Sequence, residues 1–102
     1  MNTDKLNSLS VELDGLITGF LVPVRVSKTI DPKCLARLQS LLDEIGAELE
    51  PSIEVPKKLV GTLYAVVFSL LGEADHADDP EPIEHVAWDI QERLRRIFGP
   101  RF

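Results

Sequence analysis

The chain is poor in the residues that most often build disulfides, cofactor sites and catalytic groups. Its 102 residues include one cysteine, two histidines, one tryptophan and one tyrosine. A single cysteine excludes an internal disulfide framework, which fits a reducing compartment. Because four phenylalanines are the only other aromatic residues, aliphatic side chains must supply most of the core. Residues 1–15 lack the charged-then-apolar pattern of a secretory signal, so we expect a cytoplasmic protein.

Positive charge is also scarce. The chain has 11 lysines and arginines against 17 aspartates and glutamates, and its net charge is −6. Affinity for nucleic acid rests on basic side chains that neutralise phosphates, and anionic membrane surfaces attract basic patches in the same way. The composition therefore argues against both kinds of binding and leaves a basic protein partner open.

Long hydrophobic runs are absent. The longest uncharged stretch is Leu59–Gly72, with the sequence LVGTLYAVVFSLLG. As a helix it would rise about 21 Å, whereas the hydrocarbon core of a bilayer is about 30 Å thick. We therefore predict a buried core helix of a soluble domain, covered by the rest of the chain, and no membrane span.

Apolar side chains recur at helical spacing in four segments, each forming one arc on a helical wheel. Proline in the first turn supports two of the helix starts, at Asp31-Pro32 and at Pro56. Gly46 interrupts the second segment at a cost of roughly 1 kcal/mol against alanine. The predicted helices span residues 4–20, 32–50, 56–77 and 82–98. They indicate an all-α four-helix bundle that forms one domain over residues 1–102.

Two short stretches between these helices have extended character. In residues 22–26 valine alternates with other residues, and Pro23 would confine a strand there to a sheet edge. Residues 52–55 lie between Pro51 and Pro56. The two stretches either pair as a small sheet or serve as extended connections whose valines fill the ends of the bundle. We favour the connections.

The predicted helix over residues 56–77 has one face of small residues. Bulky side chains cover about 200° of its surface. The remaining face carries Gly61, Ala65, Ser69 and Gly72. Small residues at this spacing let another backbone approach closely. We expect a neighbouring helix of the same chain there; the alternative is a homodimer through this face or through the exposed edge of the last helix.

No constellation of residues indicates catalysis. The apolar faces of the predicted helices contain no aspartate, glutamate, histidine, lysine or arginine, so we expect no cofactor or di-metal site inside the bundle. Cys34 lies within the apolar face of residues 32–50, where burial is more typical than reactivity. The sequence has no glycine-rich phosphate loop and no nucleophile elbow. We predict neither an enzyme nor a bound cofactor.

The linker Glu73–Glu84 gathers acidic residues with histidine. His76 follows Glu73 at the spacing of a Glu-x-x-His pair, and His85 comes directly after the linker. A di-iron bundle needs a second such pair, and the spacing of the acids does not match an EF-hand. We expect a solvated acidic loop, with a Zn²⁺ or Ca²⁺ site as the less favoured alternative.

Trp88 lies outside the apolar face of the last predicted helix, among charged residues. Either its indole folds back over the edge of the core, or it stands exposed as an anchor for a partner. Tryptophan and arginine are enriched among interface hot spots. We therefore predict a partner-binding surface made of Trp88, Glu84, Glu92 and Arg95, to which the family resemblance described below adds Phe102.

Two helix openings suggest a family. These are Asp31-Pro32-Lys33 and the run PKKLVGTLY from Pro56 to Tyr64, a proline followed by a leucine-valine-x-x-leucine-tyrosine pattern. With them, the segment Asp31–Phe98 resembles the pediocin-like bacteriocin immunity proteins. The arginine-rich last helix and the acidic net charge depart from that family. The resemblance implies a small cytoplasmic four-helix bundle that protects its producer cell, with recognition governed by the last helix and the tail to Phe102.

These observations predict a small, non-enzymatic protein-interaction domain, of immunity type, that binds a toxin- or bacteriocin-related partner. The alternative is a homodimeric structural or regulatory domain. A metal- or ligand-binding bundle ranks last.

Overall fold

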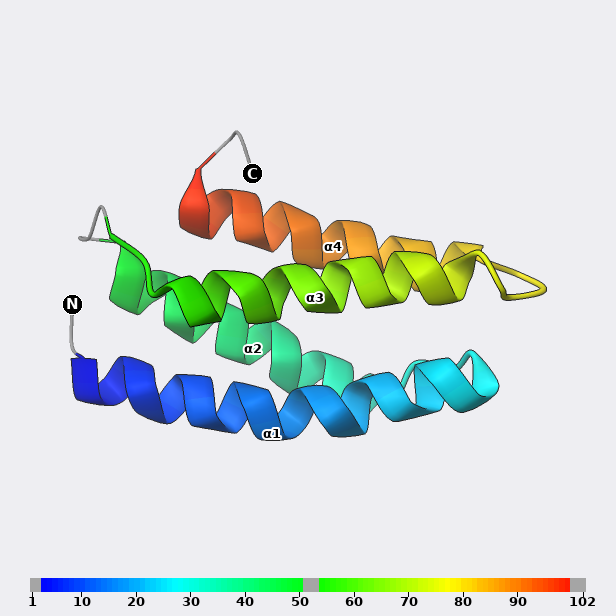
Figure 1. Cartoon of the computed structure of the whole chain (residues 1–102), viewed down its shortest axis with the longest axis horizontal. Helices are drawn as coiled ribbons and strands as arrows, with labels where there is room; N and C mark the ends of the chain where they lie inside the picture. Colours follow the sequence, from blue (N-terminus) through cyan, green and yellow to red (C-terminus); the bar gives the residue numbers. More distant parts are fainter. Residues whose placement is uncertain (1–2, 51–53, 100–102) are drawn as a thin grey trace.

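The computed structural model describes residues 3–50 and 54–99 of the chain. These residues form four α-helices: α1 (Thr3–Ser27), α2 (Pro32–Leu49), α3 (Lys57–Ala74) and α4 (Glu81–Phe98). The described part of the chain contains no strand. The prediction of an all-α four-helix bundle is confirmed (Figure 1).

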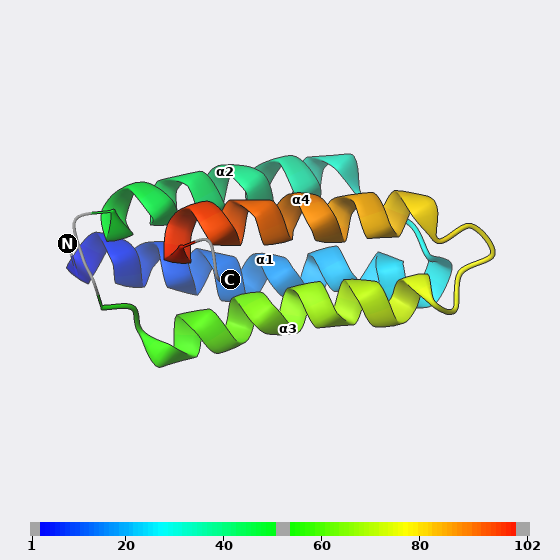
Figure 2. The same cartoon turned by 90° about the horizontal axis from the view of Figure 1, so that it is seen from above.

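The four helices are arranged as two antiparallel hairpins laid side by side. Helix α1 packs against α2, and α3 packs against α4. The hairpins meet where α1 contacts α3 and where α2 contacts α4. Helices α1 and α3 run in the same direction along the bundle (Figures 1 and 2). Each helix therefore occupies one corner of the bundle and buries the side that faces the common axis.

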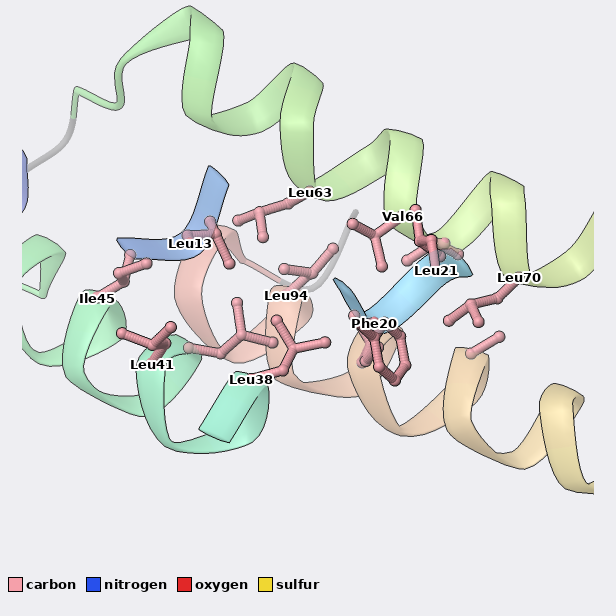
Figure 3. Close-up of a cluster of buried hydrophobic side chains, with 14 of the residues drawn as sticks. Leu13, Phe20, Leu21, Leu38, Leu41, Ile45, Leu63, Val66, Leu70 and Leu94 are labelled. Carbon is pink, nitrogen blue, oxygen red and sulfur yellow. The ribbon is translucent and has the colours of Figure 1, made fainter. Parts of the chain in front are cut away.

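A continuous aliphatic core fills the space between the helices. Phe20, Leu38, Leu63 and Leu94 come from the four different helices, and each is at most 1% exposed (Figure 3). Among the described residues no polar or charged side chain is buried. Full burial of one large apolar side chain contributes roughly 1.5–3 kcal/mol, so this core is the main source of stability.

Helix α1 is longer than predicted, and the extended interpretation of residues 22–26 is wrong. The helix continues to Ser27 and contains Pro23. Phe20 and Val24 are both fully buried, and they are one helical turn apart. Proline in a helix interior costs about 3 kcal/mol, whereas burial of Leu21 and Val24 contributes roughly 1.5–3 kcal/mol each. Packing of the helical form therefore outweighs the proline.

Helix α1 ends where Lys28 turns the chain. Lys28 has a φ of 54°, in the left-handed region that few residues other than glycine adopt. Its amide donates to the carbonyl of Val24 at 3.0 Å, and the amide of Thr29 donates to the carbonyl of Pro23 at 3.3 Å. Two carbonyls of the last turns of the helix, those of Pro23 and Val24, are thus satisfied at the turn.

The other helix boundaries lie close to their predicted positions. Asp31 caps α2, because its carboxylate accepts hydrogen bonds from the amides of Lys33 and Cys34. Helix α3 ends at Ala74 instead of near residue 77, and α4 begins at Glu81 instead of 82. Residues 52 and 53 lie outside the described residues, whereas residues 54 and 55 belong to no helix. With residues 22–26 in a helix, the small sheet does not form.

Helix α3 is not enclosed on all sides, and its small face is open. Gly61, Ala65 and Gly72 are exposed. A Cβ built on Gly61 or Gly72 would meet nothing within 4 Å. The expectation that a helix of the same chain covers this face is therefore wrong. In a bundle with one helix at each corner, a helix is covered only on the side that faces the core and its two neighbouring helices. The small residues of α3 lie on the opposite side, toward solvent.

None of the described helices is long and apolar enough to cross a membrane. This agrees with the length argument made for Leu59–Gly72.

Candidate interaction surface

Helix α4 presents a charged outer face along the whole bundle. Its buried residues recur every three or four positions, so the residues between them point outward; the buried set is Ile83, Ala87, Ile90 and Leu94. Glu81 and Glu84 lie in the first turn, and Arg95 and Arg96 lie in the last turn. Each charge complements the dipole at its end of the helix. The outer face is therefore acidic at one end and basic at the other.

Trp88 lies in the middle of this face and is 54% exposed. Its ring centroid is 5.8 Å from that of His85, with a 48° angle between the planes. Tryptophan is highly buried on average in folded proteins. The exposed orientation considered from the sequence is the one that the structure shows, and the indole does not fold back over the core.

Three of the other predicted residues flank Trp88 on the same side of α4. Glu84 is half-buried one turn before it, and Glu92 and Arg95 are exposed one and two turns after it. Arg95 Nη1 lies 3.9 Å from Glu92 Oε2. A surface pair at this distance contributes little to stability, so both charges can reorient toward a partner. Phe102 lies outside the described residues.

A shallow hollow lies beside the indole. It has a volume of about 210 Å³ and is lined by Trp88, Gln91, Glu92 and Arg95. Sites for drug-sized ligands usually have about 300–1,000 Å³. The hollow is therefore smaller than such a site, and its lining combines the indole with an amide and charges of both signs.

The acidic linker does not converge on one point. Glu73 lies on the last turn of α3, and its carboxylate accepts a hydrogen bond at 2.6 Å from Nζ of Lys28, the residue that follows α1. This hydrogen bond holds the pKa of Glu73 below its ordinary value. His85 Nε2 lies 3.4 Å from Glu81 Oε1 on α4. In the described residues no three histidine, cysteine, aspartate or glutamate side chains are grouped so that they could hold a metal ion.

Cys34 is half-buried rather than fully buried. Burial raises the pKa of its thiol, and the neighbouring carboxylate of Asp31 raises it further. A thiol with a raised pKa is a poor nucleophile at neutral pH, because the thiolate is the reactive form.

An ion-pair network between α2 and α4 was not predicted. Arg93 Nη1 donates to Asp43 at 2.7 Å, and Arg93 Nε donates to Asp89 at 3.1 Å. Gln39 Nε2 also donates to Asp89, at 2.9 Å. The Arg93 side chain is 21% exposed, so it belongs to the contact between the helices and not to the Trp88 surface. No local pattern identifies the Arg93–Asp43 pair, because its partners are 50 positions apart in the sequence.

An apolar groove between α1 and α3 was also not predicted from the sequence. It has a volume of about 310 Å³, and its lining includes Leu6, Val11, Leu59 and Thr62. The groove depends on the adjacency of two helices that are not consecutive in the chain.

Comparisons with models of known protein families, with characterised proteins and with solved structures find no significant match. Function is therefore argued from the residues of this chain.

Proposed function

We propose that the protein is a small, non-enzymatic interaction domain that binds another protein through the α4 surface centred on Trp88. The observation that carries the proposal is the 54% exposure of this indole in the middle of a charged helix face. Tryptophan and arginine are, with tyrosine, the residues most enriched among interface hot spots, and Arg95 lies two turns away on the same side.

The charges around Trp88 would set the orientation of the partner. Glu84 and Glu92 provide negative charge beside the indole, and Arg95 provides positive charge further along α4. Complementary charges at the rim of an interface mainly raise the association rate and fix the register. We therefore expect a partner with an apolar or aromatic side chain for the hollow and with basic groups nearby.

The non-enzymatic part of the proposal rests on the described core and on Cys34. The core contains aliphatic and aromatic side chains without a buried ionisable group. Catalytic sites in bundles are built from ionisable side chains that project into the core. The thiol of Cys34, with its raised pKa, does not supply a nucleophile.

The resemblance of Asp31–Phe98 to bacteriocin immunity proteins suggests what the partner is. We propose that it is a component of a toxin or bacteriocin system, met in the cytoplasm. The position of Trp88 on the last helix agrees with recognition through the C-terminal part of the chain. A toxin or bacteriocin gene next to this gene would support the assignment.

The test is a capture experiment with three immobilised proteins: the wild type, Trp88→Ala and Val11→Ala. Val11 is a matched control because it is also apolar and exposed, at 72%, but lies on α1. We expect Trp88→Ala to lose the captured protein and Val11→Ala to retain it. Truncation of a hot-spot residue costs at least about 2 kcal/mol, a loss of roughly thirtyfold in affinity.

A second measurement uses Trp88 as its own probe, since it is the single tryptophan of the chain. Titration with the captured protein should shift its fluorescence to shorter wavelength and protect it from acrylamide quenching. Unchanged capture by Trp88→Ala, or binding without any change in the environment of the indole, would show that the surface is assigned wrongly.

A further inference from the structure

Helix α3 has an outer face without any charge. This α3 outer face consists of Gly61, Tyr64, Ala65, Phe68 and Gly72. Phe68 is 66% exposed, and its ring stacks on that of Tyr64 with centroids 5.8 Å apart and planes at 17°. Single exposed apolar residues are ordinary, whereas a contiguous apolar patch of about 300 Å² or more is often functional.

The two glycines of this face do not allow any close contact within the monomer. Glycine in a helix interior costs roughly 1 kcal/mol against alanine. Gly61 and Gly72 carry this cost although a Cβ at either position would meet nothing within 4 Å. Small residues on a helix surface let a second helix approach closely. The glycines and the exposed Phe68 therefore favour the same occupant, which is another helix.

The charges at the two ends of α3 indicate which helix this is. Lys57 begins α3 and Asp75 directly follows it, and both are exposed. Each charge is unfavourable for the dipole at its own end of α3, since that dipole favours acids at the start and bases at the end. Beside an antiparallel copy of α3, each would meet an opposite charge and the favourable end of the other helix. The face is thus complementary to itself.

We propose that the protein forms a homodimer in which the α3 outer faces of two copies pack antiparallel about a two-fold axis. With the axis at the middle of the face, Phe68 of each copy lies level with Ala65 of the other. Gly61 of each copy lies level with Gly72 of the other. The large ring thus meets a small side chain, and the glycines allow close approach at both ends. Such an interface is isologous, the commonest arrangement of homodimers.

The same register pairs the terminal charges. In this register Asp75 of each copy is level with Lys58 of the other, and Lys57, one residue or about 1.5 Å further along the axis, lies on the same side of the helix pair as Asp75. Within one chain Lys57 and Asp75 are separated by the length of α3, about 27 Å at 1.5 Å per residue. Any energetic coupling between Lys57 and Asp75 must therefore arise from contacts between two copies of the chain.

The size of the face predicts the strength of the dimer. Taken over the whole of α3, a contact about 27 Å long and about 10 Å wide covers roughly 300 Å², whereas stable interfaces bury about 800 Å² on each partner. The dimer is therefore reversible and concentration-dependent. It does not use the Trp88 surface, so dimer formation and partner binding can fail independently.

The first test is sedimentation equilibrium over a range of concentrations. We expect the wild type to shift from the mass of one chain to that of two. Phe68→Asp should weaken the dimer at least about tenfold, or about 1.4 kcal/mol, because it places a charge on the apolar face. Val11→Asp is the control, since Val11 is 72% exposed on α1 and should leave the mass curve unchanged. Circular dichroism verifies that both variants remain helical.

The second test is charge reversal at Lys57 and Asp75. Lys57→Asp and Asp75→Lys should each weaken the dimer roughly threefold to tenfold, and the double variant should restore it. Failure of the double variant to restore the dimer would overturn the antiparallel register. A wild type that stays monomeric up to its solubility limit overturns the proposal, and the α3 outer face would then be left to a different protein. Loss of the dimer in Val11→Asp, with retention in Phe68→Asp, would overturn it as well.

Discussion

Ile97 of α4 packs directly on Gly46 of α2. A Cβ added to Gly46 would lie 3.1 Å from Cγ1 of Ile97, which is tighter than an ordinary van der Waals contact. From the sequence, Gly46 is a costly interruption of a helix. In the fold it is the point where the last turn of α4 reaches the backbone of α2, so the cost is offset by a closer contact between the helices.

This contact predicts that two glycine substitutions differ in their effect on the free energy of unfolding. A Cβ at Gly15, on the exposed side of α1, would meet nothing within 4 Å. Gly15→Ala should therefore raise the free energy of unfolding by about 1 kcal/mol through helix propensity. Gly46→Ala should bring no such gain, because Ile97 must move. Urea denaturation measures both, and an equal gain in the two variants would contradict a close contact at Gly46.

The proline within α1 offers a second prediction. Pro23 has no amide hydrogen to donate within the helix. Pro23→Ala should raise the free energy of unfolding by about 1–2 kcal/mol, since the restored hydrogen bond outweighs the greater freedom of the unfolded chain. The neighbouring Val22→Ala is the control and should change stability by less than about 0.5 kcal/mol. Denaturant-induced unfolding measures the stability of both variants. A less stable Pro23→Ala protein would mean that packing of the proline ring contributes more than the missing hydrogen-bond donor costs.

A third prediction concerns acid. The hydrogen bond from Lys28 lowers the pKa of Glu73 from its ordinary value of 4.5. A depressed folded pKa stabilises the protein above the ordinary value, and this contribution is lost as the pH falls through the folded pKa. Stability should therefore decrease below pH 4.5, and Glu73→Gln should show a smaller decrease while losing stability at neutral pH.

The measurement for Glu73 is the thermal midpoint at neutral pH and at a pH well below 4.5. Asp78→Asn serves as the control, because Asp78 is an exposed acid of the same linker. Equal acid sensitivity in the wild type and Glu73→Gln would show that the Lys28 hydrogen bond does not contribute.

Much of the fold could be predicted because burial follows the helical period. Leu38, Leu41, Leu42 and Ile45 are spaced as one face of a helix, and all four are fully buried. The helical period did not identify a helix over residues 22–26, because five residues with alternating valine fit a strand as well as a helix. There the burial of Val24 against the core decided the outcome, and no local pattern contains that information.

The position of Trp88 outside the apolar face of α4 was predictable for the same reason. That position left two orientations of the indole open, and only the structure decides that it is exposed. The Arg93–Asp43 pair and the Gly46–Ile97 contact were not predictable, because each joins residues about fifty positions apart. Such contacts depend on which helices become neighbours.

The sequence by itself determined the four amphipathic helices, the core without buried charge and the place of Trp88 outside the apolar face of α4, because each follows from spacing along one helix. Only the tertiary structure decided that α1 neighbours α3, that α2 neighbours α4 and that Gly61, Ala65 and Gly72 face outward. The physical reason is that periodicity sets which side of a helix is buried, whereas its neighbours are chosen by the combined packing of side chains distant in the chain. The uncharged stretch Leu59–Gly72 therefore forms one corner of the bundle, with one side in the core and an open face toward solvent.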